Sequence, residues 1–354
     1  MRVKLGILGF GFMGHEHENM MVDFRDKADL VAICDNVPEQ MADAKTPNIK
    51  KYDNMDNFFQ DKEMNTVIVA LPNHLHKEAV IKAARAGKHI ICEKPVALNV
   101  KELDEMMRVV KEFGVKFTVH QQRRFDPDFR IAKEIFDKQE VGNVYTIQTS
   151  LYGINGKLHD WHIYKKYGGG MLYDWGVHLI DQVLWMIPGK IKTIYADIRN
   201  VINEEVDDYF KILLRFDNNI ISEIELGTYF LSDKPKWFER HWFIGGNKGS
   251  AYIDGFEPTG KICTTTRLLE EVGKTRTMSS AGPTRSFGEP APGILQTKPL
   301  PIVNTSWKMY FDNFFKAMNE EEDFLVKVSE VRRVLAVMEA VRESGKIGKT
   351  IDFE

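Results

Sequence analysis

The chain has 354 residues, 43% of them hydrophobic, which is enough for two domains with separate cores. Its 48 Lys and Arg against 51 Asp and Glu give a formal charge of -3 without a long run of one sign, which argues against nucleic acid or an anionic membrane and favours a small-molecule partner. Three widely spaced cysteines match no zinc pattern and favour a reducing cytoplasm, and we expect neither a secretory leader nor a membrane span.

The first third of the chain alternates short apolar runs with helical patterns. The helical stretches His74–Ala86 and Val100–Phe113 are each followed by a glycine, the residue that favours the end of a helix. The apolar runs indicate strands buried on both faces of a sheet: Val3–Leu8, Leu30–Cys34, Val67–Leu71, His89–Cys92 and Val115–Val119. Alternation of this kind implies right-handed crossovers and a parallel, doubly wound sheet. We therefore predict a Rossmann domain over residues 1–122.

From about Tyr145 the pattern changes to strands in hairpin-like succession. The turn Asp217-Asn218-Asn219, between two of them, is the clearest hairpin signal. The predicted strands are Tyr145–Tyr152, Lys192–Ile198, Asp208–Phe216, Ile220–Tyr229, Trp242–Ile244 and Ser250–Ile253. They predict an α/β domain over residues 123–354 with a large open, mostly antiparallel sheet.

Three helices are expected in this second domain, over Met171–Met186, Trp307–Asn319 and Val328–Arg342. The segment Gly273–Pro301 is rich in Gly, Pro, Ser and Thr, which indicates a long surface loop or an arm. Such an arm would either cover a pocket or reach a neighbouring subunit, and we favour the neighbouring subunit.

A glycine-rich turn follows the first strand and opens a helix. Its glycines permit a tight turn and admit a pyrophosphate to the helix N-terminus. Asp35 ends the second strand roughly 20 residues further on, where a carboxylate accepts hydrogen bonds from a ribose hydroxyl. Because a carboxylate repels a 2′-phosphate, NAD is favoured over NADP. The turn consists of Gly9, Phe10, Gly11, Phe12, Met13 and Gly14.

The loop Leu71-Pro72-Asn73-His74, with His76 just beyond it, follows the third predicted strand. In a doubly wound sheet the carboxyl ends of the strands border the ligand, so we expect this loop beside the dinucleotide. A catalytic histidine is one interpretation. The favoured interpretation is helix capping and phosphate or ribose contact by Asn73 and His76.

Lys94, in Glu93-Lys94-Pro95, follows the next strand and faces the same edge of the sheet. A cation there would stabilise an alkoxide that forms as a hydroxyl loses hydride. A solvent-exposed lysine before a loop proline explains the position equally well.

A second candidate group lies where Gly168-Gly169-Gly170 leads into the predicted helix Met171–Met186. Helical spacing places Asp174 one turn before His178, on the side opposite an apolar stripe. A carboxylate beside an imidazole orients the ring and raises its basicity, as a general base requires. A solvated polar face is the alternative, although the triple glycine favours close approach of a substrate.

These motifs together resemble the glucose-fructose oxidoreductase, inositol dehydrogenase and MocA family. Their order and spacing match over nearly the whole chain: Gly9 to Gly14, Leu71-Pro72-Asn73 with His76, Gly87-Lys88-His89, Glu93-Lys94-Pro95, Arg123-Arg124-Phe125-Asp126-Pro127 and Gly169-Gly170 through Asp174, Gly176 and His178. The resemblance implies a nicotinamide nucleotide, substrates among sugars, sugar derivatives and cyclitols, and a homodimer, a homotetramer or a larger homo-oligomer.

The resemblance also implies residue roles. Lys94 and His178 form the catalytic pair, Asp174 binds substrate or orients His178, and the Lys94-Pro95 bond is a candidate cis peptide. Glu93 and Gln122, with Lys94, complete the cofactor set. Candidates for sugar contacts, besides Lys94, Asp174 and His178, are Arg123, Trp161, His162 and Lys165.

The residue after Trp161 bears on the kind of substrate. Many relatives have an arginine where this chain has His162, so an anionic substrate group is not supported. His159, Asp160, His162 and His178 show no known ligand spacing, so no metal is predicted.

We expect an NAD-dependent oxidoreductase that converts a secondary ring hydroxyl of a sugar or glycoside, with C3 as a candidate position, to a ketone. The alternatives are a cyclitol dehydrogenase, a glycosidase that uses a transient 3-keto intermediate, and a sugar-sensing regulator without catalysis. Lys94 and His178 argue against the sensor, because a binder needs no acid–base pair.

Overall fold

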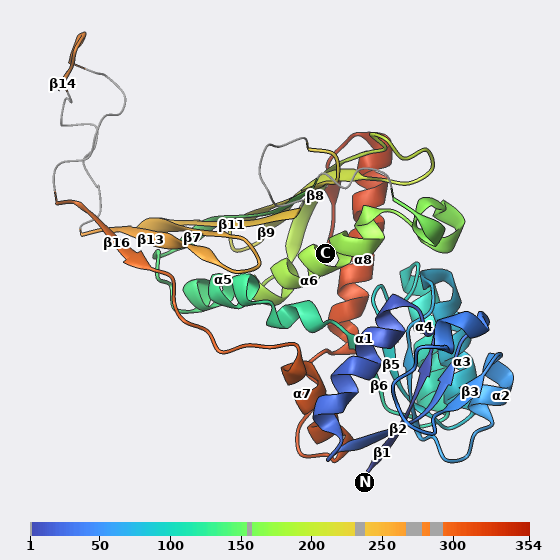
Figure 1. Cartoon of the computed structure of the whole chain (residues 1–354). Coiled ribbons are helices and arrows are strands. Elements are labelled where there is room, and N and C mark those ends of the chain that lie inside the picture. Colours follow the sequence, from blue (N-terminus) through green and yellow to red (C-terminus); the bar gives the residue numbers. More distant parts are fainter. Residues whose placement is uncertain (1, 154–157, 231–237, 267–277, 284–292) are drawn as a thin grey trace.

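The computed structural model describes residues 2–153, 158–230, 238–266, 278–283 and 293–354. A six-stranded parallel sheet is followed by a nine-stranded, mostly antiparallel sheet (Figure 1). This confirms the predicted fold class. The six-stranded sheet lies at one end of the molecule with its helices, and the second sheet extends away from it.

The first sheet has the strand order β3-β2-β1-β4-β5-β6, in which every adjacent pair is parallel. Its strands are β1 Val3–Leu8, β2 Ala28–Cys34, β3 Lys50–Tyr52, β4 Thr66–Val69, β5 His89–Glu93 and β6 Phe117–His120. The sequence did not predict β3, because this short edge strand begins with two exposed lysines instead of an apolar run. The order changes direction at β1 and β4, so their carboxyl ends form the switch point at which such sheets bind ligands.

The helices of this half are α1 Phe12–Met21, α2 Met55–Phe59, α3 His76–Arg85 and α4 Val100–Glu112. The predicted helix ends are confirmed, because Gly87 and Gly114 have φ angles of 70° and 65°. The helix predicted from His74 begins two residues later, because Asn73–Leu75 first forms a 3-10 turn.

The second sheet has the order β16-β13-β12-β11-β7-β10-β9-β8-β17, and only the β7–β10 pair is parallel among its described strands. The strands are β7 Val144–Gly153, β8 Ile191–Arg199, β9 Tyr209–Phe216, β10 Ile221–Gly227, β11 Phe238–Gly246, β12 Gly249–Asp254, β13 Thr259–Thr265, β16 Leu295–Pro299 and β17 Ile351–Asp352. The predicted hairpin is confirmed, because β9 and β10 are antiparallel and Asn219 adopts a positive φ of 66° between them.

The prediction that Gly273–Pro301 forms a loop or an arm is wrong in part. Its last residues form β16, which pairs with β13 at the edge of the sheet. The prediction missed β16 because every residue of it is exposed and it has no buried apolar face. The strands β14 Met278–Ser279 and β15 Gly282–Pro283 form a small ribbon that Figure 1 places away from the body. Residues 273–277 and 284–292 of this segment lie outside the described residues.

Helices of the second half pack against one face of the large sheet (Figure 1). They are α5 Pro127–Asp137, a π-helix over Leu172–Gly176, α6 Val177–Met186 and α8 Val328–Ile347. Residues 177–183 of α6 are buried, so the alternative interpretation of this stretch as a solvated polar face is wrong.

Helix α7, Lys308–Met318, is distant in sequence from the first sheet but packs on that half of the chain. The rings of Phe311 and Phe315 lie 5.8 and 5.3 Å from that of Phe24, and Lys27 forms an ion pair with Asp312. The core of the first half is therefore completed from the C-terminal region. The division at residues 122 and 123 stays a prediction.

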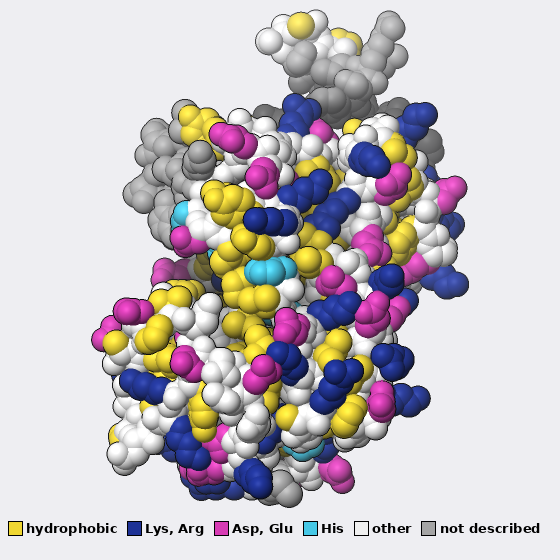
Figure 2. All heavy atoms as spheres, turned by 90° about the vertical axis from the view of Figure 1, so that its right-hand side faces the viewer, with side chains coloured by type: hydrophobic (Ala, Val, Ile, Leu, Met, Phe, Trp, Pro, Cys, Tyr) yellow, Lys and Arg dark blue, Asp and Glu magenta, His cyan; other side chains and the backbone are white. Residues whose placement is uncertain are grey.

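The surface in Figure 2 shows positive and negative side chains interspersed, with hydrophobic side chains between the upper and lower parts. No described helix is long and apolar enough to cross a membrane. All three cysteines are free thiols, as expected for a chain without a disulfide framework.

Candidate active site

The glycine turn has the shape that a dinucleotide requires. Gly9 has a φ of 91°, and a Cβ there would lie 2.4 Å from the carbonyl oxygen of Ala70. A Cβ at Gly14 would lie 2.4 Å from the carbonyl oxygen of Gly9, whereas a Cβ at Gly11 would meet no atom within 4 Å. The first and third glycines are thus needed for packing. The second leaves open space for a phosphate beside the N-terminus of α1.

The side chains between these glycines differ in exposure. The ring of Phe10 is buried and packs on His15, with the ring centroids 4.4 Å apart, so only its backbone borders the turn. Phe12 is 79% exposed and Met13 is partly exposed, at the start of α1. No side chain caps α1 at Gly11. The first backbone N–H groups of α1 can therefore donate hydrogen bonds to a pyrophosphate.

Asp35 holds the glycine turn from the adjacent strand. One carboxylate oxygen accepts from the backbone N–H of Phe10 at 2.7 Å, and the other accepts from Val37 at 2.9 Å. A carboxylate has about four lone-pair positions, so both oxygens can also accept from a ribose. Asp35 therefore fits a predicted cofactor contact and has a structural role as well.

The residues of the Leu71–His76 loop have other partners than the predicted phosphate or ribose. His76 is fully buried, with its ring nitrogens 2.9 Å from the carbonyl oxygen of Pro95 and 2.7 Å from that of Leu71. Asn73 is buried and donates to the carbonyl oxygen of Gly168 at 2.8 Å. Neither side chain caps a helix. Both tie the loop to its neighbours, while Leu71 and Pro72 stay partly exposed at its edge.

Lys94 and Asp174 meet between the two halves of the chain. Lys94 Nζ donates to Asp174 Oδ1 at 2.9 Å and to its carbonyl oxygen at 3.0 Å. Burial is the largest single effect and would raise the pKa of Asp174, but the charge and hydrogen bond of Lys94 together with the charges of His162 and Arg123 outweigh it, so the pKa is lowered. The side chains keep 15% and 31% of their surface exposed, so a substrate can reach both. The expected cis bond between Lys94 and Pro95 is present.

His178 has a different partner from the one predicted. Its Nδ1 lies 3.2 Å from Gln121 Oε1, whereas Asp174 pairs with Lys94. The expected pairing assumed α-helical spacing, but Asp174 lies in the π-helix, whose wider hydrogen-bonding pattern changes the alignment of the side chains. Because the amide oxygen only accepts, Nδ1 carries the proton and Nε2 keeps the lone pair that a base needs.

The pKa of His178 is held well below its ordinary value of 6.5 by burial and then by the charges of Lys94 and Arg123. Its imidazole is therefore neutral at pH 7. We expect the acid limb of kcat/KM for oxidation to lie well below pH 6.5, since only protonation at lower pH removes the base. Arg123→Gln removes a cation and should move this limb to higher pH. A pH–rate profile with its limb at or above 6.5 would contradict the assignment.

Arg123 is held by aromatic rings instead of extending freely toward a substrate. Its guanidinium lies 4.1 Å from the ring of Trp175 and 5.2 Å from that of Trp307, and it pairs with Asp126 at 3.0 Å. Its side chain keeps 19% of its surface exposed. A substrate contact is thus limited to one edge of the group, while its charge acts on His178.

The other predicted sugar contacts lie in the 3-10 turns before the triple glycine. Trp161 stacks on His162 with ring centroids 3.8 Å apart, so one face of the indole is covered. The pKa of His162 is lowered by burial, and the charges of Asp174 and Lys94 also act on it, so it lies near these two residues. Lys165 is exposed, and no described bond joins its side chain to that pair.

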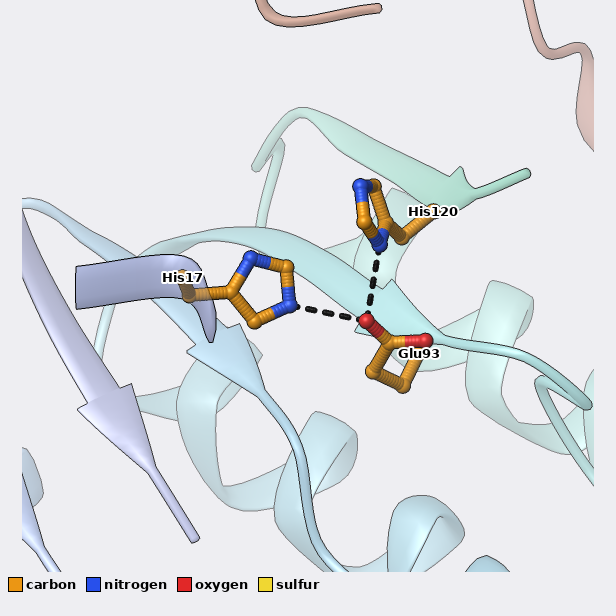
Figure 3. Close-up of side chains that lie close together, drawn as sticks. All are labelled: His17, Glu93 and His120. Carbon is orange, nitrogen blue, oxygen red and sulfur yellow. Dashed lines mark hydrogen bonds and ion pairs between the residues drawn. The ribbon is translucent and has the colours of Figure 1, made fainter. Parts of the chain in front are cut away.

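Glu93 and Gln122 were predicted to contact the cofactor, but both are buried. Glu93 Oε1 lies 2.7 Å from His17 Nε2 and 2.7 Å from His120 Nδ1 (Figure 3). Its other oxygen accepts from the backbone N–H of Lys94 at 3.2 Å. Gln122 Oε1 is buried and has no hydrogen-bond partner among the described residues.

The sequence did not predict Gln121, His17 or His120. Gln121 immediately follows β6 and precedes the predicted Gln122, so its position after a strand was an available signal. His17 and His120 gave no signal, because each lies in an element that reads as ordinary helix or strand. Their meeting at Glu93 depends on how α1, β5 and β6 pack.

Two family models match this chain. One, described as an oxidoreductase family with an NAD-binding Rossmann fold, matches residues 3–121, and one described as the GFO/IDH/MocA C-terminal domain matches residues 129–252. The chain belongs to the GFO/IDH/MocA family. The protein is therefore an NAD-binding oxidoreductase. The first family model includes the glycine turn, and the second includes strands of the second sheet.

Similar proteins of the GFO/IDH/MocA family differ in reaction. The chain is 30% identical to 2,7-anhydro-N-acetylneuraminate hydratase of Escherichia coli, over 73% of this chain and 70% of that protein. It is 26% identical to the Bacillus subtilis scyllo-inositol 2-dehydrogenase (NADP(+)) IolW, over 99% of this chain and 96% of that protein. The solved structure of an NAD-binding protein from Listeria innocua is 31% identical, with a TM-score of 0.88 and 99% of both chains covered.

Proposed function

We propose that this protein is an NAD-dependent dehydrogenase that oxidises a secondary ring hydroxyl of a sugar, glycoside or cyclitol to a ketone. The observation that carries the proposal is the ion pair of Lys94 and Asp174 at the carboxyl edge of the Rossmann sheet, with His178 near enough for the Lys94 charge to act on it. It combines a cation that can hold an oxygen with a neutral imidazole that can take a proton.

Bound NAD supplies the hydride acceptor. Lys94 holds the substrate oxygen, and Asp174 fixes the Lys94 ammonium through the 2.9 Å ion pair. His178 Nε2 removes the hydroxyl proton, while Gln121 keeps the ring in the tautomer that leaves Nε2 free to accept. Hydride leaves the same carbon, and the product is a ketone.

A neutral cyclic polyol fits the residues around this pair. The uncovered face of Trp161 can stack on a pyranose ring, and His162 follows it instead of a cation that would select an anionic group. The relative named for scyllo-inositol supports this class of substrate. We favour a pyranoside.

A second candidate is a reaction without net redox change, in which a transient ketone precedes elimination or addition. The relative named as a hydratase favours it, because hydration consumes no nicotinamide. A glycosidase with a transient 3-keto intermediate is the same type of reaction. It needs one more acid to expel the leaving group.

An assay with NAD and a panel of sugars, glycosides and cyclitols distinguishes these reactions. Reduced nicotinamide with a ketone product supports the dehydrogenase. Released aglycone, or a hydrated product, without net reduction supports the second candidate. If ligands bind but no substrate of the panel turns over, the protein is a sugar sensor and the proposal is wrong.

We further propose that NAD is preferred over NADP, because Asp35 would repel a 2′-phosphate. One relative is named for NADP, so the preference varies within the family. Asp35→Asn keeps an acceptor for Phe10 N–H but removes the charge. We expect the ratio of the dissociation constants for NADP and NAD to fall by about tenfold, as measured by fluorescence titration. An unchanged ratio would show that Asp35 does not select the cofactor.

The protein is proposed to form a homodimer or a homotetramer through the outer face of its open sheet. Figure 1 shows α5 and α6 on one face of this sheet and no described helix on the other. That other face exposes Tyr195, Ile221 and Tyr252, of which Ile221 is 45% exposed. Ile221→Glu should lower the mass measured by light scattering to that of a smaller assembly. A monomeric wild type would contradict the proposal.

A further inference from the structure

His17, Glu93 and His120 form a cluster around the carboxylate of the residue that immediately precedes Lys94 (Figure 3). Each residue comes from a different element, namely α1, β5 and β6, and all three side chains are buried. Both imidazoles approach the same oxygen of Glu93 at 2.7 Å, and the centroids of the two rings lie 4.7 Å apart. The arrangement resembles a set of metal ligands, because the three ligand atoms lie within 4.8 Å of one another.

Two observations favour hydrogen bonds over a metal. A metal would lie between the ligand atoms at about 2.0–2.2 Å from each, but here the nitrogens contact the oxygen at ordinary hydrogen-bond distance. Metal-bound histidines also donate their second ring nitrogen to a neighbour. Among the described residues, His17 Nδ1 and His120 Nε2 have no such partner.

The hydrogen bonds determine the charge of the cluster. A carboxylate oxygen only accepts, so the protons lie on His17 Nε2 and His120 Nδ1. Burial would raise the pKa of Glu93, but the contacts with His120 and His17 hold it well below its ordinary value. A second proton on His17 Nδ1 or on His120 Nε2 would be a buried donor without a partner among the described residues, and burial also lowers the pKa of His120. The cluster is thus one carboxylate with two neutral rings.

Helix α7 closes the cluster from the other side. The ring of Tyr310 lies 4.7 Å from that of His120, and Phe311 contacts both imidazoles at 5.4 and 6.0 Å. These aromatic side chains are buried, so the carboxylate lies in a dry environment where its charge is weakly screened. Buried aromatic rings of α7 therefore border the two imidazoles, while the carboxylate of Glu93 contacts the backbone of Lys94.

We propose that His17, Glu93 and His120 form a metal-free positioning cluster, which places one buried negative charge beneath Lys94 and ties the glycine-turn helix to the strand that presents Lys94. Glu93 accepts from the Lys94 backbone N–H at 3.2 Å, which fixes the residue that carries the catalytic cation. Asp174 already pairs with the Lys94 ammonium. The two carboxylates together exceed the lysine by one negative charge, which favours the cationic oxidised nicotinamide over the neutral reduced one.

The inference rests on the proposed role of Lys94, but its main test needs no substrate. Glu93→Gln keeps the size of the side chain and removes its charge. We expect the ratio of the dissociation constants of NAD+ and NADH to rise by about tenfold, measured by fluorescence titration of the full chain. Turnover of any substrate found should fall by about 10²-fold, since displacement of Lys94 misplaces the reacting oxygen. A folded variant with an unchanged ratio would overturn the charge assignment, whether or not a substrate is known.

Matched variants separate hydrogen bonding from a metal. His17→Gln and His120→Asn place an amide donor where each ring donates, so they should retain at least tenfold more turnover than His17→Leu and His120→Leu. Equal loss in both pairs would show that the donors do not matter. Metal analysis of the wild type should find no bound equivalent at this cluster, and one equivalent lost in Glu93→Gln would overturn the proposal.

A measurement on the wild type covers the case in which Glu93→Gln does not fold. Nitrogen-15 NMR of labelled histidine should show one neutral tautomer at His17, protonated at Nε2, and the opposite tautomer at His120, protonated at Nδ1. Two doubly protonated rings would give the cluster a positive charge. That result would contradict the proposal.

Discussion

Lys94→Met and His178→Asn are each expected to lower kcat by roughly 10²–10⁴-fold, the usual contribution of a positioned acid or base. Lys94→Met removes the cation that holds the developing alkoxide, and its Nζ is the donor to Asp174. His178→Asn removes the lone pair on Nε2 but can still donate to Gln121. Because both side chains are proposed to act on the substrate, the dissociation constant for NAD should rise by no more than about threefold over wild type.

Lys101→Met is the matched control, because Lys101 is exposed on α4 and lies in no contact that the site uses. It should leave kcat and cofactor affinity unchanged. Stopped-flow measurement of nicotinamide reduction separates the chemical step from product release. Equal losses of NAD affinity and of turnover in Lys94→Met would identify Lys94 as a cofactor residue instead of a catalytic one.

Arg240→Met is expected to lower the free energy of unfolding by about 3–5 kcal/mol, because it leaves a buried carboxylate without its cation. Arg240 and Asp128 are both buried, and Arg240 Nε donates to Asp128 Oδ2 at 3.0 Å. Its guanidinium also donates to Thr149 at 2.6 Å and to Gln182 at 2.8 Å. Gln182 lies on α6 and donates to the carbonyl oxygen of Arg123 at 2.7 Å, so the network supports the helix that carries His178.

Urea unfolding followed by tryptophan fluorescence measures this change. Arg215→Met is the matched control, because Arg215 is exposed on β9 of the same sheet, and we expect less than about 0.5 kcal/mol there. Replacing Asp128 by Leu in the Arg240→Met background should recover part of the loss, since no unpaired charge then remains. A loss below about 1 kcal/mol in Arg240→Met would show that water reaches Asp128.

Much of the fold could be predicted from the sequence because its strands carry strong patterns. Val3–Leu8 is an apolar run buried on both faces, and its bounds are those of β1. β16 could not be predicted in this way, because Leu295–Pro299 is exposed and is a strand only through its pairing with β13. The π-helix at Leu172–Gly176 could not be predicted either, because the search for helical periodicity assumes 3.6 residues per turn.

The candidate site was predicted in part. The structure brings Lys94 and Asp174 together and places His178 beside the charges of Lys94 and Arg123, as the family resemblance indicated, whereas helical spacing wrongly paired Asp174 with His178. The partners of His76 and Glu93 could not be read from the sequence, because both side chains turn into the protein. A strand end shows that a residue lies at the binding edge, but not which way its side chain points.

Deuterium transfer tests the central claim most directly, namely that hydride leaves a ring carbon held between Lys94 and His178. A substrate from the panel is labelled with deuterium at its reacting carbon and incubated with enzyme and NAD for a single turnover. We predict deuterium at C4 of the nicotinamide with wild type and roughly 10²–10⁴-fold slower transfer with Lys94→Met. Label that appears in water, or transfer at an undiminished rate in Lys94→Met, would contradict this account.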